Sequence, residues 1–336
     1  AMDPYPMPQT DQTPEGQNQG DEVDTGTVAD AVSGNWVATP APEWTRPYLR
    51  LSRADRPIGT WLLLLPCWWG VLLAASLDRF EPFDLWIMGG CAIGAFLLRG
   101  AGCTWNDITD RKFDASVERT RSRPIPSGQV TVQGAGIWMC VQSLLAFGIL
   151  LTFIWMAIFM GIASLSLVAI YPFAKRFTWW PQAFLGLAFN WGARFAWVAH
   201  TGSLDWPAVW LYVAGSCWTL FYDTIYAHQD KEDDALIGVK STARLFGDAP
   251  PRWLRAFMEL TVLALAIAII LPLTEAGASA LTLAIAIGAP WALGWHLAWH
   301  IRTLDTEEPD RCMMFFRSNR YAGVLPVLFL AAAAFA

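Results

Sequence analysis

The sequence predicts an all-α, polytopic membrane protein with nine transmembrane helices bundled around a central cavity. Three observations indicate this class. Of the 336 residues, 54% are hydrophobic and only 15% are charged, which is too apolar for an ordinary soluble domain. The apolar residues form long blocks, most of them near the roughly 20 residues that a helix needs to cross a bilayer. Lys and Arg collect in alternate connecting segments, as they do in loops that stay on the cytoplasmic side.

The nine predicted spans can be placed in chain order. They cover residues 59–77, 85–105, 132–151, 153–172, 179–199, 207–227, 254–273, 279–300 and 319–336. The boundary between the third and fourth spans is the weakest, because little more than Thr152 separates two apolar runs. With the N terminus inside, twenty of the 23 Lys and Arg residues fall in inner segments. A wrong helix count in the middle of the chain would destroy this alternation, so we expect a cytoplasmic N terminus.

Residues 1–42 are predicted to form a disordered, acidic tail. The first 45 residues carry eight acidic residues and no Lys or Arg, so they cannot bury enough apolar surface to fold. The tail has neither the basic start and apolar stretch of a signal peptide nor the Arg-rich bias of a transit peptide. We therefore expect a bacterial inner (plasma) membrane. Residues 43–336 form the predicted transmembrane domain, in which 43–56 suit a short helix lying in the interface.

The first of two acidic clusters lies at the inner end of the second span. On a helix, residues three, four and seven positions apart share a face. Arg99, Asn106, Asp110 and Asp114 follow this spacing and form one stripe. Asp107 borders the stripe, because it lies three residues before Asp110.

The second cluster lies at the inner end of the sixth span and repeats the pattern. Asp223, Asp230 and Asp234 share a face, with Tyr226 close to it. Two motifs four spans apart suggest a duplicated four-helix unit with a ninth helix appended. A bundle built in this way would bring the two clusters to face each other across a central cavity.

Carboxylates this dense at a bilayer boundary are costly, because unpaired charge is poorly solvated there. Divalent cations that hold a phosphorylated substrate would offset the cost, and oxygen ligands of this kind suit Mg²⁺. The alternative is a charged helix end whose acids reach water and pair with nearby Lys and Arg. Two matching stripes on separate helices favour the metal, and the clusters do not offer the ligand sets typical of zinc or redox metals.

Cations gather at the same inner mouth. Arg119 and Arg123 lie in a stiff segment with two prolines, and Lys175 and Arg176 follow Tyr171 at the end of the fourth span. Each of these cations could instead be a positive-inside residue without a ligand. Arg99 is harder to explain in that way, because it lies within a span, where an anionic partner is expected. Arg194 is also within a span, and its role stays open.

These motifs resemble the UbiA superfamily of intramembrane prenyltransferases, and in particular its members that act on 4-hydroxybenzoate. The resemblance covers about residues 45–336 and leaves out the acidic tail. The motifs that carry it are Asn106-Asp-x-x-Asp110-Arg-x-x-Asp114, Arg119-Thr-Arg-Ser-Arg123-Pro-Ile-Pro-Ser-Gly128, Tyr171-Pro-Phe-x-Lys175-Arg176, Tyr222-Asp-Thr-x-Tyr-Ala-x-x-Asp230-x-x-Asp-Asp234, Lys240-Ser-Thr-Ala243 and Asn319-Arg-Tyr-x-Gly323.

The resemblance implies a nine-helix bundle with a cavity open laterally to lipid, a polyprenyl diphosphate donor, an aromatic acceptor and Mg²⁺. It implies that Asp110, Asp114, Asp230 and Asp234 hold the metal–diphosphate and that Asn106 and Asp107 support them. Arg99, Lys175 and Arg176 would bind diphosphate or the acceptor carboxylate. Arg119, Arg123, Tyr171, Asp223 and Tyr226 complete the expected substrate contacts. Asp107 and Arg99 are expected to assist the chemistry, and Asp230 is the expected proton acceptor, although diphosphate itself could serve.

Other readings remain at this point. An ion-coupled transporter would place ionisable groups near mid-membrane on several helices, whereas the acids here crowd one mouth. The same chemistry on homogentisate, dihydroxynaphthoate or haem is the closer alternative. The sequence predicts no nucleic-acid partner, and it indicates neither protein partners nor the length of the isoprenoid chain.

Overall fold

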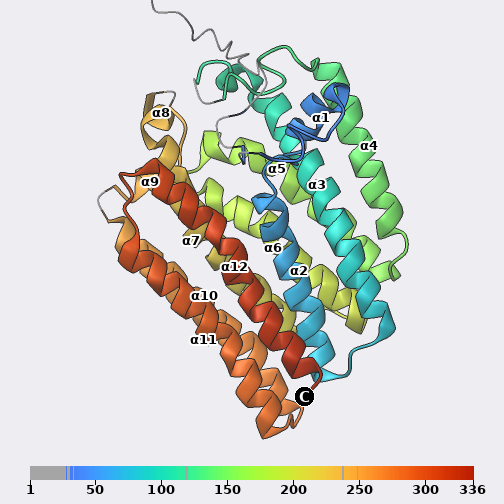
Figure 1. Ribbon diagram of the computed structural model, residues 1–336. Helices are drawn as coiled ribbons and strands as arrows, with labels where there is room; N and C mark the ends of the chain where they lie inside the picture. The colour runs from blue at the N-terminus through green and yellow to red at the C-terminus, as the bar shows by residue number, and fades with distance from the viewer. Residues whose placement is uncertain (1–27, 29–30, 33, 118–119, 237, 248) are drawn as a thin grey trace, which may run out of the picture.

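The computed structural model is a bundle of long helices (Figure 1). It describes residues 28–336 except 29–30, 33, 118–119, 237 and 248, and of Asp230 and Asp233 it describes only the backbone. Within these described residues every regular element is a helix, so the predicted all-α class is confirmed. Residues 1–27 of the predicted tail lie outside the described residues, whereas residues 34–42 form turns in which Val37 and Ala41 are buried.

Nine helices of 19 to 33 residues form the bundle in the part of the chain that the structure describes. Their bounds are α2 Ile58–Leu77, α3 Pro82–Asp114, α4 Val132–Leu150, α5 Trp155–Phe177, α6 Pro181–Thr201, α7 Trp206–Ala227, α10 Pro250–Glu275, α11 Ala280–Thr303 and α12 Pro309–Ala334. Six of them, namely α2, α3, α4, α5, α10 and α11, are long and apolar enough to cross a membrane. The chain is therefore an integral membrane protein, and passage of α6, α7 and α12 through the bilayer stays a prediction.

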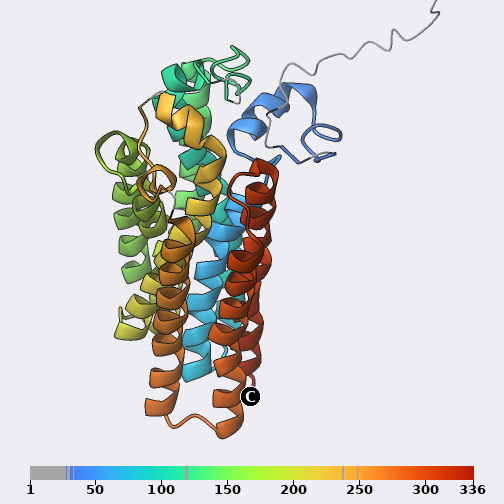
Figure 2. The ribbon, with the colours of Figure 1, turned by 90° about the vertical axis from the view of Figure 1, so that its left-hand side faces the viewer.

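Among the described residues, five short helices lie at one end of the bundle, and we call this the cap end (Figures 1 and 2). They are η1 Glu43–Thr45, α1 Arg46–Leu51, η2 His228–Asp230, α8 Lys231–Leu236 and α9 Thr242–Leu245. The N-terminal turns are fixed to this end by a hydrogen bond of 3.0 Å from Trp36 Nε1 to the Ala54 carbonyl. The predicted interfacial segment 43–56 thus contains η1, α1 and the turns that lead into α2.

The helices α2 and α6 form the centre of the bundle, and α2 also packs against α3 and α12. A side chain at Gly70 on α2 would place Cβ only 2.2 Å from the Ala193 carbonyl on α6, so the absence of a side chain allows this close approach. On the other flank of α2, the indole of Trp69 donates to the Gly323 carbonyl of α12 at 2.8 Å and lies 5.1 Å from the ring of Trp218. These contacts fix the helices that carry the site.

Among the helices that extend beyond the apolar blocks, α3 and α12 do so most. The second span was expected to end at residue 105, but α3 continues to Asp114, and α12 begins at Pro309 rather than near residue 319. Hydropathy detects only the portion of a helix that meets lipid, whereas backbone hydrogen bonding continues as long as the local sequence permits. The extensions matter because both bring charged residues to the cap end on a rigid helix.

Candidate functional site

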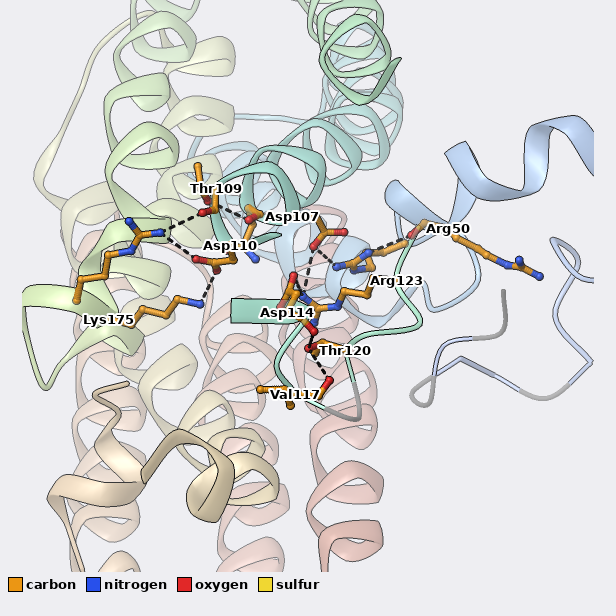
Figure 3. Close-up of polar contacts among 12 residues, drawn as sticks. Arg50, Asp107, Thr109, Asp110, Asp114, Val117, Thr120, Arg123 and Lys175 are labelled. Carbon is orange, nitrogen blue, oxygen red and sulfur yellow. Dashed lines mark hydrogen bonds and ion pairs between the residues drawn. The ribbon is translucent and has the colours of Figure 1, made fainter. Parts of the chain in front are cut away.

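The carboxylate of Asp110 on α3 is fully buried and held by two cations from α5 (Figure 3). Lys175 Nζ lies 2.5 Å from Oδ2, and Arg176 Nη2 lies 3.2 Å from Oδ1. The guanidinium of Arg176 also lies over the rings of Phe113 and Phe173, at 5.5 and 5.0 Å from their centres. The predicted anion-binding cations of α5 therefore contact the first acidic motif directly.

The two other carboxylates of this motif share a cation from the following loop. Arg123 Nη1 lies 2.9 Å from Asp114 Oδ2 and 3.4 Å from Asp107 Oδ1. Asp107 also accepts a 2.6 Å hydrogen bond from Arg53 Nη2. The loop is fastened to the helix end by Thr120, whose hydroxyl donates to the Asp114 carbonyl at 2.9 Å (Figure 3). All three acids of the motif are thus neutralised within the protein.

Acids of both motifs line one small polar pocket of about 230 Å³. Asp114 comes from the first motif, and Asp223 and Asp234 come from the second, with the amide of Asn106 beside them. Arg123, Lys175 and Lys240 line the same pocket, so three carboxylates face three cations. Asp223 makes no hydrogen bond or ion pair with another described residue. The predicted opposition of the two motifs is therefore seen in the structure at this pocket.

The polar pocket joins a cavity of about 1280 Å³ between the helices. Five residues line both, which places them at the junction: Asn106, Arg123, Tyr171, Asp223 and Tyr226. Beyond the junction the wall is formed mainly by apolar side chains of α3, α4, α5 and α6. Tyr226 is fixed from behind by Phe316 of α12, whose ring centre is 4.5 Å away.

Arg99 lies in the large cavity, two helical turns from Asn106 on α3. Its guanidinium lies 5.2 Å from the ring centre of Phe189, and its Nε–H is buried without a hydrogen-bond partner among the described residues. The side chain fits only because residue 59 is glycine, since a Cβ there would lie 2.4 Å from Arg99 Nε. A buried guanidinium donor with no partner is costly, which favours an anionic ligand at this point.

Not every predicted site residue can be placed. Arg119 and the side chain of Asp230 lie outside the described residues. Asp110 lines neither cavity, because its carboxylate is occupied by Lys175 and Arg176. Among the described side chains no group of three or more Asp, Glu, His or Cys residues is close enough to hold a metal ion. The metal ligands expected from the sequence thus stay a prediction.

The structure adds residues that the sequence did not single out, and Arg53 is the first of them. Arg53 was counted only as a cation of an inner segment, yet its guanidinium is buried and pairs with Asp107. Its backbone has φ 57°, a left-handed conformation that costs a residue with a side chain roughly 1–3 kcal/mol. Strain of this kind persists where surrounding contacts fix the residue. No spacing or composition signal distinguishes Arg53 from the cations beside it.

His228 of η2 was also not expected to contribute. Burial lowers the pKa of His228, so the ring is neutral at neutral pH. In that form Nδ1–H donates to the Thr224 carbonyl at 2.7 Å, which leaves Nε2 buried without a described partner. The ring therefore fastens η2, which lies within the second motif, to the last turn of α7. Thr224 is itself fixed from outside by a hydroxyl contact of 2.8 Å with Thr242 of α9.

The sequence model of the UbiA prenyltransferase family matches residues 63–320, which includes both acidic motifs and the cations around them. The chain belongs to the UbiA prenyltransferase family. The rat protein named 4-hydroxybenzoate polyprenyltransferase, mitochondrial, is 47% identical over 297 residues, which cover 88% of this chain and 76% of the relative. The human protein of the same name is 44% identical over 300 residues, with coverage of 89% and 78%. The Arabidopsis thaliana protein of that name is 43% identical over 325 residues, with coverage of 93% and 74%.

Solved structures of UbiA homologs share the fold. The homolog from Archaeoglobus fulgidus bound to GPP and Mg²⁺ has a TM-score of 0.62 at 16% identity and matches 86% of this chain and 100% of its own. The homolog from Aeropyrum pernix K1 has a TM-score of 0.60 at 21% identity, with coverage of 82% and 96%. At this level of identity the likeness concerns the arrangement of helices.

Proposed function

We propose that this UbiA family member transfers the polyprenyl group of a polyprenyl diphosphate to 4-hydroxybenzoate and thereby forms 3-polyprenyl-4-hydroxybenzoate, a step of ubiquinone biosynthesis. Relatives at 43–47% identity over most of the chain carry the name of this activity. The observation that carries the proposal is the continuity of a polar pocket with a large, mainly apolar cavity. A substrate with a charged head and a long apolar tail would fit this arrangement, with its head in the polar pocket and its tail in the apolar cavity.

The polar pocket suits the diphosphate head. Lys175, Lys240 and Arg123 supply positive charge for phosphate oxygens, and the facing acids supply oxygen ligands for a divalent cation. We infer Mg²⁺ as the cation, since hard oxygen donors favour it and a homolog structure is described as bound to GPP and Mg²⁺. One oxygen of Asp107, Oδ2, is buried without a described partner, which fits a further positive ligand. When bound, Mg²⁺ would neutralise the charge that develops on the leaving diphosphate.

The protein's own groups would prepare the reaction in three ways. Cations around the bound head group favour cleavage of the allylic C–O bond, because they stabilise the charge that develops on the leaving diphosphate. The apolar wall excludes water, which would otherwise trap the allylic cation. The hydroxyl of 4-hydroxybenzoate activates the ring carbon ortho to it, so we expect attack there, meta to the carboxylate. Asp230, or the released diphosphate, would then take the ring proton.

The site residues expected from the sequence are proposed with these roles. Asp110, Asp114, Asp230 and Asp234 would hold the metal–diphosphate, which requires Lys175 and Arg176 to move from Asp110 to phosphate oxygens. Asn106, Asp107 and Asp223 would support the metal and the head group, together with Arg119 and Arg123. Arg99, Tyr171 and Tyr226 would contact the substrates at the junction of the two cavities.

The location of the protein has two aspects, which are the membrane that holds it and the side that the cap end faces. The relatives are named as mitochondrial proteins, so they give no support to the bacterial inner membrane expected from the sequence. We infer that the cap end, with α1 and both acidic motifs, faces the side on which cationic loops are retained during insertion. Labelling of single cysteines introduced at residue 112 and at residue 203 would test this orientation.

A transfer assay tests the function. Membranes containing the protein are given radiolabelled polyprenyl diphosphate, Mg²⁺ and either 4-hydroxybenzoate, homogentisate or dihydroxynaphthoate. We expect labelled product with 4-hydroxybenzoate and its loss on chelation of Mg²⁺. Product with one of the other acceptors alone would contradict the proposed acceptor, and absence of product with every acceptor would contradict prenyl transfer.

A further inference from the structure

Arginines outnumber acidic residues in the lining of the large cavity. Of its lining residues, six are arginines and two are aspartates. They are Arg53, Arg56, Arg99, Arg123, Arg317, Arg320, Asp223 and Asp310. The smaller polar pocket differs, because its three carboxylates balance its three cations. Arg123 also lines the polar pocket and Arg53 pairs with Asp107, so both belong to the acidic site. Arg56, Arg317 and Arg320 line another part of the cavity, which we call its arginine-rich side.

This side lies between α12 and the turn that precedes α2. Arg56 lies in that turn, and Arg317 and Arg320 lie on α12. The helix α12 packs against α2. The N-terminal turns cover the same place, since Ala31 and Val32 also line the cavity. Figure 2 shows this N-terminal segment above the upper end of α12. Arg317 is exposed, whereas Arg56 is buried and its Nη1 lies 3.6 Å from the Asp55 carboxylate.

The helix that carries Arg317 and Arg320 also contacts the junction of the two cavities. Phe316 precedes Arg317 on α12, and its ring lies 4.5 Å from that of Tyr226 at the junction of the two cavities. Arg320 is the eleventh residue beyond Pro309, roughly 16 Å along the helix at 1.5 Å per residue. The predicted apolar span of this helix begins near residue 319, so Arg320 lies at the inner mouth of the bundle. The guanidinium of Arg320 is oriented by its 2.6 Å hydrogen bond to the Tyr321 hydroxyl.

The two substrates of the proposed reaction need different routes. The donor is amphiphilic, and its tail matches the apolar wall formed by α4, α5 and α6. The acceptor is a small aromatic carboxylate that dissolves in water, so it needs an aqueous path with positive charge. Arginine suits such an anion, because its planar guanidinium can donate two parallel hydrogen bonds to a carboxylate. Positive charge along a cleft also raises the rate at which anions enter.

On the basis of the proposed function, we propose that Arg56, Arg317 and Arg320 line the passage by which the aromatic carboxylate reaches the prenyl donor from the aqueous side. The passage opens under the N-terminal turns and ends at Tyr226. It is distinct from the acidic pocket and from the apolar side of the cavity.

The test compares the KM values of the two substrates in the full-length protein. Arg317→Gln and Arg320→Gln, alone and combined, are assayed in membranes. The double variant should raise the KM for 4-hydroxybenzoate by roughly tenfold, since steering by charge changes encounter rates by about 10- to 1000-fold. Its kcat and its KM for the polyprenyl diphosphate should stay within about twofold of the unsubstituted values. Arg320→Lys should restore most of the loss, because it keeps the charge.

Two controls separate a passage from a structural effect. Arg311→Gln removes an exposed cation of the same helix that pairs with Glu308 at 2.7 Å and does not line the cavity, so it should leave both KM values unchanged. The methyl ester of 4-hydroxybenzoate has no charge, and its KM should not respond to the arginine variants. A rise in the donor KM alone, or no change in either KM, would overturn the passage. Failure of the unsubstituted protein to prenylate 4-hydroxybenzoate would instead reject the proposed function, and with it a passage for this acceptor.

Discussion

Lys175 on α5 and Asp110 on α3 form a partly buried ion pair whose charged atoms are 2.5 Å apart, although 65 residues separate them in the chain. Arg176 contacts the other oxygen of the same carboxylate. A cation proposed for phosphate and an acid proposed for metal thus neutralise each other. Binding of a metal–diphosphate would replace this ion pair by two new contacts. Asp110 would bind the metal, and Lys175 would bind a phosphate oxygen.

Asp110→Asn should abolish Mg²⁺-dependent prenyl transfer. The amide keeps the shape of the side chain but removes the charge that the metal needs, so we expect a loss of at least about 100-fold. Initial rates over a range of Mg²⁺ concentrations check this, with membrane insertion measured in parallel. The matched control is Asp205→Asn at the other end of the bundle, outside both cavities, which should keep full activity. Full activity of Asp110→Asn would contradict the metal assignment.

Arg176→Ala should weaken substrate binding more than it weakens the fold. The guanidinium is partly exposed, so its pairing with Asp110 contributes little stability, whereas its loss removes a cation close to the proposed diphosphate site. We expect the KM for polyprenyl diphosphate to rise by roughly 10- to 150-fold, as for loss of one charge-assisted hydrogen bond. Lys112→Ala, an exposed cation at the end of α3, is the control. Unchanged KM values for both substrates would exclude a binding role for Arg176.

Gly59→Ala should lower activity while the protein stays folded. The added Cβ would lie 2.4 Å from Arg99 Nε, and a long side chain can move aside at small cost, so the fold survives but Arg99 leaves its position. A melting temperature close to the original value, together with a reduced kcat, is the expected result. Gly89→Ala, where a Cβ meets nothing within 4 Å, should change neither quantity. A fully active Gly59→Ala would show that the position of Arg99 is not important.

The contributions of Arg53 and Asp107 to the free energy of unfolding should be coupled and not additive. Removing one partner leaves a buried charge, so Arg53→Gln and Asp107→Asn should each destabilise the fold, by up to about 3–5 kcal/mol. The double variant should lose less than the sum of the two, with a coupling of roughly 0.5–3 kcal/mol. Thermal unfolding of the four proteins in one detergent measures this cycle. Additive losses would show that the 2.6 Å contact contributes no coupling.

Several features of this protein follow from local sequence. The apolar blocks indicate most of the membrane helices, because transfer of about 20 apolar residues into hydrocarbon is favourable wherever they fold. The spacing of Asp110 and Asp114 likewise indicates a shared helix face, because residues at positions i and i+4 are adjacent on any α-helix. Family membership, confirmed by the match to residues 63–320, rests on the same short motifs.

Other features depend on contacts between distant segments. Nothing near Asp107 indicates that Arg53 is its partner, because the two meet only after the turn before α2 folds back over α3. The spacing of the first motif suggests that Asp110 faces the same pocket as Asp114, yet the packing of α5 turns Asp110 to Lys175 instead. The arginine-rich side of the cavity also joins residues 56 and 320, which lie far apart in the chain.

The sequence by itself thus determined the class of fold, the family and the kinds of residue available for chemistry, since these depend on composition and on neighbours along a helix. The tertiary structure alone decided which acid meets which cation, and where the polar pocket passes into the apolar cavity. The physical reason is that a buried charge must find its counter-charge in space, and the crossing of helices sets which one lies within reach.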